Sequence, residues 1–368
     1  QGQGPLNGET MRSRLLILMM LVLLASCVPT EPPAEVSIPF TWAYRAGDYV
    51  RGEPAVSDGV VYVGADDNAL HAVDAASGEA IWQYETADNV TSSPAVGEDA
   101  VYFGSWDGTV YALDATEGDL RWQYETDGWV TGSPMLWIDR LYIGSHDGFF
   151  YALSAEDGER MWWHRTGGAI VGGAALVGNT VFFGSADNYL YALDTSRGEL
   201  LWRHRTGGDI VSTPAIDSET VYAGSVDRKL YALDVASGEL LWAFEAGDAI
   251  ESSPAVAEGI VYFGANDGRL YALNSRDGRL AWQFQAEDII RSSPVVRGDL
   301  VFVGSDDCYL YGIDRESGTL VWRYRTAGAI VAGPAVADEG LFASSIDRYL
   351  HAFDLASEQE SQGETSGN

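Results

Sequence analysis

Lysine is nearly absent from this 368-residue chain, and cysteine is scarce. Lys229 is the one lysine, and Lys and Arg together number 22 against 54 Asp and Glu, so the formal net charge at pH 7 is -32. Nucleic-acid affinity comes largely from Lys and Arg that neutralise phosphates, so this charge excludes a nucleic-acid-binding protein. With 46% hydrophobic and 12% aromatic residues the chain can still bury a large core, which excludes general disorder.

Long hydrophobic runs are also missing, apart from one near the N-terminus. This run spans 15–25 and follows Met11 and two arginines. Its 11 residues are too few to cross a bilayer of roughly 30 Å as a helix, but they suit the apolar part of a signal peptide. We therefore expect residues 1–26 to comprise upstream residues and a signal peptide.

The run ends in Leu24-Ala25-Ser26-Cys27, which resembles a bacterial lipobox. In such a motif the cysteine is acylated and becomes the mature N-terminus, so we expect lipidation of Cys27 and a Pro-rich tether over 27–38. Val28 differs from the Asp associated with inner-membrane retention in enteric bacteria, which favours the periplasmic side of the outer membrane. The alternative is an ordinary signal peptide with a coincidental cysteine. Lipidation would leave Cys308 alone, so we predict no disulfide and no Cys/His metal site.

The rest of the chain repeats one unit eight times at 40-residue intervals. The repeated tryptophans are Trp42, Trp82, Trp122, Trp162, Trp202, Trp242, Trp282 and Trp322. The repeated aspartates are Asp67, Asp107, Asp147, Asp187, Asp227, Asp267, Asp307 and Asp347.

One copy shows what each unit folds into. Short β-branched and aromatic runs at 92–96, 101–105, 110–114 and 120–126 alternate with Gly, Asp and Ser clusters, which predicts four strands. Four antiparallel strands in about 40 residues are typical of a propeller blade. The sequence thus predicts an all-β fold, an eight-bladed β-propeller over residues 39–357, followed by a disordered tail over 358–368.

The two ends of the repeat array indicate how the ring closes. The eighth copy lacks its fourth strand, because Gln362 stands where the next Trp should be and Glu358 where the Gly should be. An unpaired strand at 40–44 precedes the first complete blade. We expect this strand to pair into the eighth blade, which would remove an exposed sheet edge.

The repeat resembles a known family. The pattern Ala72-x-Asp74-x-x-Ser77-Gly78-x-x-x-Trp82 recurs in the following copies and resembles the tryptophan-docking motif of PQQ-like repeat propellers. The resemblance implies that each Trp packs against the Ala of an adjoining blade and that the Gly makes a turn. It therefore implies a structural docking role for all eight repeated tryptophans. Gly312 replaces the Ala once.

Two kinds of PQQ-like repeat propeller are relevant to this chain. PQQ-dependent alcohol dehydrogenases are longer and carry a vicinal Cys pair, calcium ligands and an Asp base on inserted loops, none of which this chain provides. The lipoprotein of the bacterial outer-membrane barrel-assembly machinery matches in length and anchor and is a non-catalytic scaffold. The resemblance implies a non-enzymatic, monomeric scaffold without a cofactor. A small-ligand or PQQ-binding propeller with oxidoreductase-type activity is the alternative.

Recurring polar residues are expected to be structural. The repeated Asp should cap its own turn, with Gly108, Gly148, Gly268, Asn68 and Asn188 at the following position of positive φ. His164 and His204 on neighbouring blades could share a metal, but hydrogen-bonded core histidines are the prediction, and the same holds for His71 and His351. No catalytic residue and no metal ligand is predicted.

Departures from the repeat indicate where a partner binds. In propellers the loops that join the fourth strand to the next first strand share one face with the loops that join the second to the third. Variable, hot-spot-type residues in these loops are the predicted partner-binding set. They are Tyr49, Arg51, Trp106, Trp129, His146, Glu251 and Arg291. Trp106, Trp129 and His146 come from adjoining blades and are expected to form an exposed aromatic patch.

Overall fold

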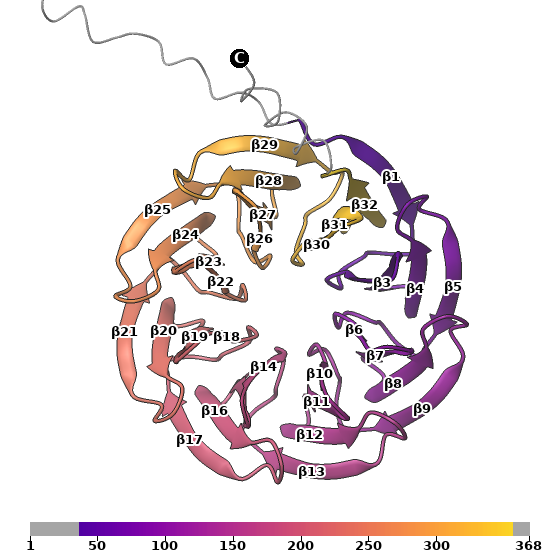
Figure 1. Ribbon diagram of the computed structural model, residues 1–368, viewed down its shortest axis with the longest axis horizontal. Coiled ribbons are helices and arrows are strands. Elements are labelled where there is room, and N and C mark those ends of the chain that lie inside the picture. The colour runs from indigo at the N-terminus through magenta and orange to yellow at the C-terminus, as the bar shows by residue number, and fades with distance from the viewer. Residues whose placement is uncertain (1–36, 356–368) are drawn as a thin grey trace, which may run out of the picture. The chain divides into compact units, whose positions relative to one another are not determined.

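The computed structural model describes residues 37–355, which form eight four-stranded antiparallel sheets arranged in a ring (Figure 1). The predicted eight-bladed β-propeller is therefore confirmed. Within 37–355 no helix is long and apolar enough to cross a membrane. The predicted signal peptide, Cys27, most of the tether and the C-terminal tail lie outside these residues.

Seven blades place their strands in chain order from the centre of the ring to its rim, and the eighth takes β1 as its outermost strand (Figure 1). The innermost strands are β2 Ala55–Ser57, β6 Ala95–Val96, β10 Met135–Trp137, β14 Ala174–Val177, β18 Ala215–Asp217, β22 Ala255–Ala257, β26 Val295–Arg297 and β30 Ala335–Ala337. The second strands are β3 Val60–Ala65, β7 Ala100–Gly104, β11 Arg140–Gly144, β15 Thr180–Ser185, β19 Thr220–Gly224, β23 Ile260–Gly264, β27 Leu300–Gly304 and β31 Gly340–Ser344.

The outer half of the blades follows the same order. The third strands are β4 Ala69–Asp74, β8 Thr109–Asp114, β12 Phe149–Ser154, β16 Tyr189–Asp194, β20 Lys229–Asp234, β24 Arg269–Asn274, β28 Tyr309–Asp314 and β32 Tyr349–Phe353. The outer strands are β5 Ala80–Glu85, β9 Leu120–Glu125, β13 Arg160–Arg165, β17 Leu200–Arg205, β21 Leu240–Glu245, β25 Leu280–Gln285, β29 Leu320–Arg325 and β1 Phe40–Arg45. We number the blades from β2–β5, blade 1, to β30–β32 with β1, blade 8.

Burial explains why the middle strands carry the most apolar sequence. All five residues of β7 are buried, whereas β9 alternates between exposed and covered side chains. Middle strands are covered on both faces by the neighbouring blades, so both faces must be apolar. The innermost strand is shorter than the predicted 92–96, because Pro94 has no N–H and the Ser92 hydroxyl instead bonds the backbone of Gly104.

The N-terminal strand closes the ring as predicted. β1 pairs antiparallel with β32 and becomes the outer strand of blade 8, with Trp42 opposite Ala352 and Tyr44 opposite Leu350. Phe40 stacks on Tyr324 of blade 7 at 5.8 Å between ring centroids. The chain end at β1 therefore covers the edge that β32 would otherwise expose.

Seven of the repeated tryptophans join one blade to the next. Each indole Nε1 donates to the backbone carbonyl 33 residues later, in the following blade, at 2.9–3.1 Å. Each ring also covers the turn glycine of that blade. At Gly118, with φ of 74°, a Cβ would lie 2.7 Å from the Trp82 ring. In the strand register the motif alanine Ala72 lies opposite Trp82 of its own blade.

The eighth tryptophan docks differently. Trp322 lies nearly perpendicular to Phe302 and Phe353, with interplanar angles of 81° and 80°. The corresponding angles at Trp82 and Trp122 are 47° and 41°. At the repeat position of the turn glycine the eighth copy has Glu358, which lies outside the described residues. Phe353 of blade 8 contacts the indole instead.

Candidate docking face

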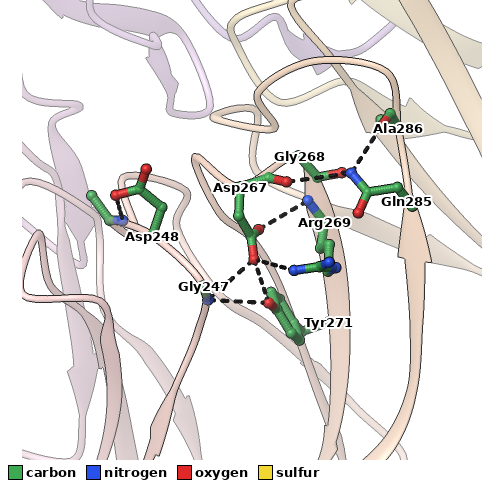
Figure 2. A network of polar contacts seen from close by, with 9 residues as sticks. Gly247, Asp248, Asp267, Gly268, Arg269, Tyr271, Gln285 and Ala286 are labelled. Atoms are coloured by element: carbon green, nitrogen blue, oxygen red, sulfur yellow. Dashed lines mark hydrogen bonds and ion pairs between the residues drawn. The ribbon is translucent and has the colours of Figure 1, made fainter.

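The repeated aspartates join neighbouring blades along one face of the ring. In Figure 2 the Asp267 carboxylate accepts from the Gly247 amide at the end of the preceding blade, from the Tyr271 hydroxyl and from Arg269. The turn-capping role is confirmed by the bond from the Arg269 amide to the same carboxylate. In the preceding blade the Tyr231 hydroxyl donates to Asp227 in the same way. Burial is the main cause, and this bond the second, that raises the pKa of Tyr231 to about 12. These carboxylates are therefore occupied by structural bonds.

The residue after the repeated aspartate has a positive φ in the copies where we predicted it and in three further copies. Gly108, Gly148, Gly268, Asn68 and Asn188 have φ between 66° and 86°. Arg228, Cys308 and Arg348 occupy the same position in three other blades with φ of 71–78°. Non-glycine residues pay a steric cost there, so the bonds of the neighbouring aspartate must hold these turns in place.

The histidines take part in hydrogen bonds that serve the scaffold. His71 lies 3.1 Å from Asp67 and 3.0 Å from the Tyr44 hydroxyl, and His351 lies 3.1 Å from Asp347. His204 Nδ1 is 3.2 Å from the Gly238 carbonyl, and burial is the main cause that lowers the pKa of His164. Among residues 37–355 no three His, Cys, Asp or Glu side chains are grouped so that they could hold a metal ion.

The loops chosen from the sequence do share one face. The backbone amide of Asp66 donates to the Tyr49 carbonyl, that of Trp106 to Asn89 and that of His146 to Trp129. Each bond joins the loop between second and third strands to the loop before the first strand. A second contact recurs between side chains 15 residues apart in five blades, and the pairs are Arg51–Asp66, Thr91–Trp106, Thr131–His146, Glu251–Asn266 and Arg291–Asp306.

Three aromatic rings meet where blades 2 and 3 adjoin. Trp106 and Trp129 stack with centroids 4.9 Å apart and an interplanar angle of 17°, and His146 lies 5.5 Å from Trp129. Trp129 is 49% exposed, whereas Trp106 is half-buried and donates to the Thr91 hydroxyl. Burial lowers the pKa of His146, which favours the neutral imidazole. We call Trp106, Trp129 and His146 the aromatic cluster.

The aromatic cluster lines a cavity of about 510 Å³. Its remaining lining residues are Asp107, Gly108, Thr126, Asp127 and Gly128. Asp107 is bound by the Ala87 amide and the Tyr111 hydroxyl, and Asp127 is exposed. The lining thus contains two acidic residues and no Lys or Arg.

The other predicted residues lie apart from this cluster, on blades 1, 6 and 7. Arg51 pairs with Asp66 at 2.7 Å and covers the Tyr49 ring, and Arg291 pairs with Asp306 at 2.7 Å. Glu251 accepts from Asn266. Burial raises the pKa of Asp66 and Asp306 despite their arginine partners. The structure therefore divides the predicted set into an aromatic sector and a charged sector.

Sequence reasoning missed a residue on the axis of the ring. Glu53 occupies a repeat position that holds Ser93, Ser133, Gly173, Thr213, Ser253, Ser293 and Gly333 in the other copies. A single charge among small residues was a signal that the sequence contained. It was overlooked because the position precedes the first strand and was not assigned to either set of loops.

An eight-bladed β-propeller whose blades are joined by tryptophan docking is the class of protein that these features define. The profile of the family described as outer membrane protein assembly factor BamB matches residues 40–194, 146–288 and 285–360. The chain belongs to this family, which confirms the predicted PQQ-like repeat resemblance. No curated protein matches the chain.

Solved structures share the fold. BamB from Moraxella catarrhalis superimposes with a TM-score of 0.76 at 22% identity, covering 87% of this chain and 100% of its own. The computationally designed protein Ika8 gives 0.78 at 16% identity, with 86% and 100% covered. Quinohemoprotein alcohol dehydrogenase from Comamonas testosteroni gives 0.74 at 17% identity, with 86% and 76% covered. Likeness at these identities shows the propeller fold and no particular activity.

Proposed function

We propose that this protein is a scaffold of the bacterial envelope that binds a protein partner through the face carrying the aromatic cluster. The observation that carries the proposal is the half-exposed Trp129, stacked on Trp106 beside a cavity, at a position held by Asn89 and Ala169 in the adjoining copies. Exposed aromatics in a recess are typical of interface hot spots.

Family membership and the N-terminal sequence support a particular setting. The relative from Moraxella catarrhalis is a BamB, and the family is described as an outer membrane protein assembly factor. We propose lipidation at Cys27, attachment to the periplasmic side of the outer membrane and a partner in the barrel-assembly machinery. Globomycin treatment and mass spectrometry of the mature N-terminus would test the anchor.

Removing the aromatic cluster tests the docking role. We expect the Trp106→Ala/Trp129→Ala double variant to lose about 30-fold or more in partner capture, since hot-spot aromatics contribute about 2 kcal/mol or more each. Its stability should fall by only about 1–2 kcal/mol, because Trp129 is exposed and Trp106 loses one stacked ring and one hydrogen bond. Crosslinking in cells with mass spectrometry identifies the partner, and thermal melting measures stability.

One control variant and the stability of the double variant decide how this experiment is interpreted. Trp122→Ala, in the core, should destabilise the propeller strongly, whereas a collapse of the double variant would assign Trp106 and Trp129 to the core. If capture and stability both survive, the docking role of the aromatic cluster is wrong. Tyr49, Arg51, Glu251 and Arg291 would then be the next residues to substitute.

A quinone-dependent dehydrogenase is the second candidate, because quinohemoprotein alcohol dehydrogenases share the fold. We expect no such activity, since the sequence has no adjacent cysteines and its uniform 40-residue spacing leaves no inserted loops for calcium ligands. Purified protein should be mixed with PQQ and calcium and assayed for dye reduction with alcohols and sugars. Turnover that disappears when a carboxylate is substituted would replace the scaffold proposal.

A further inference from the structure

The residues just before the innermost strands lie next to one another from blade to blade, and four of them are joined in a row by hydrogen bonds. The Gly173 amide donates to the Thr213 hydroxyl, the Thr213 amide to Ser253 and the Ser253 amide to Ser293, at 2.9–3.2 Å. Each of these hydroxyls therefore leans toward the preceding blade. We call the eight residues at this repeat position the axial ring.

Glu53 is the one charged member of the axial ring. It leans in the same direction, because a Cβ placed on Gly333 would lie 3.1 Å from the Glu53 carboxylate. The missing side chain at Gly333 leaves the room that this carboxylate occupies. The same point is 3.1 Å from the Ser293 carbonyl oxygen, so two acceptor groups lie close to Gly333.

The Glu53 carboxylate has no partner of its own. Within residues 37–355 it makes no hydrogen bond and no ion pair. Glu53 is half-buried, and desolvation raises the pKa of its carboxyl group to about 7. The ring positions around it contribute Ser93, Ser293 and Gly333, none of which carries a charge. An ionised carboxylate in such a place is costly unless a cation approaches it.

The loop face beside Glu53 is acidic. Arg51, two residues earlier, already pairs with Asp66, whose carboxylate is also repelled by Asp48 and Asp67. On blade 7 the paired Asp306 is repelled by Asp288 and Glu251. Among the described residues, four buried polar atoms without a partner lie in this charged sector, and they are the acceptors Asp66 Oδ1, Asn266 Oδ1 and Asp306 Oδ1 and the donor Arg291 Nε. Acceptors therefore outnumber donors among these atoms.

We propose that the docking partner inserts a basic side chain, arginine or lysine, from the loop face into the axial ring and pairs it with Glu53. This inference rests on the proposed function and adds the chemistry of the partner. A cationic donor would satisfy the Glu53 carboxylate, and charge-assisted bonds of this kind are strong. The negative field of the loop face would steer the cation toward the axis.

The test uses N-acetyl-arginine methylamide as probe and the uncharged N-acetyl-citrulline methylamide as its matched control. Binding to the full chain and to each variant is measured by isothermal titration calorimetry, and in the wild-type chain the ¹³C-carboxyl resonance of Glu53 reports where the probe binds. We expect saturable binding of the arginine probe, at least tenfold weaker binding of the citrulline probe, and at least a tenfold loss in Glu53→Gln. Glu125→Gln removes the same charge from an exposed position of β9 and should leave binding unchanged.

A second variant and a pH series sharpen the test. Gly333→Ser should weaken binding, because its Cβ would fall against the Glu53 carboxylate. The probe stays charged while Glu53 ionises through about pH 7, so affinity should rise about tenfold from pH 6 to pH 8. Glu53→Gln should lack this rise.

The outcomes separate this inference from the docking role. Equal binding of the citrulline probe, or probe binding that survives in Glu53→Gln, would overturn the axial site. Absence of any probe binding to the wild-type chain would overturn it as well. If the Trp106→Ala/Trp129→Ala variant nevertheless loses partner capture, the docking face stands and the basic anchor alone is wrong.

Discussion

A chain that begins at Arg45 should fail to form a stable propeller. Without β1, blade 8 loses its outer strand and β32 becomes an exposed edge that can pair with other molecules. The bond from Trp42 to the Ala75 carbonyl and the contact between Tyr44 and His71 are lost too. Loss of the Trp42 side chain alone costs about 3–5 kcal/mol, a large part of the roughly 5–15 kcal/mol that stabilises a typical domain.

Size-exclusion chromatography and thermal melting measure this effect. We expect the shortened chain to aggregate or to melt far below a control chain that begins at Ile38 and keeps the whole of β1. A monomeric truncated protein with an unchanged melting temperature would show that the N-terminal strand is not needed for closure.

Replacing one docking tryptophan should cost about 3–5 kcal/mol, and strand β13 offers a control beside it. Trp162 is 8% exposed, donates to the Thr195 carbonyl and covers Gly198, whereas Trp163 is 48% exposed and meets Phe149 at the surface. We therefore expect Trp162→Ala to be strongly destabilising and Trp163→Ala to cost about 1 kcal/mol or less. Urea denaturation of both variants gives the two free energies of unfolding.

The eighth tryptophan supplies a further comparison. The eighth copy has Glu358 in the sequence where the other copies have the turn glycine, so Trp322→Ala should cost less than Trp162→Ala, by about 1 kcal/mol. Equal losses for Trp162 and Trp322 would mean that burial of the indole, and not its docking onto the turn glycine and carbonyl of the next blade, determines its contribution.

The sequence alone determined the architecture because its information is periodic. Tryptophans and aspartates at 40-residue intervals, with four β-type runs between them, predict eight equivalent blades. The missing fourth strand of the last copy predicts closure by residues near the N-terminus. These inferences depend on a pattern that is present in eight copies, so an atypical residue in one copy does not change the predicted fold.

The tertiary structure decided what each departure from the repeat does. Trp106 and Trp129 were both expected to be exposed, but stacking and the bond to Thr91 partly cover Trp106. Arg51 and Arg291 turned out to be paired with carboxylates 15 residues away, which no local pattern predicts. These contacts arise when separate loops meet on one face, and the distance along the chain hides them.

Glu53 shows what the sequence reveals about a residue and what only the folded structure reveals. Its departure from the small residues of the other copies is visible in the sequence, but its place on the ring axis is not. Only the folded ring brings it against Gly333 and removes every partner for its carboxylate. Periodicity along the chain determined which strands and blades form. The burial of side chains and their hydrogen-bond partners were decided by closure of the ring, because closure brings together residues of blades 1, 7 and 8 that lie at opposite ends of the sequence.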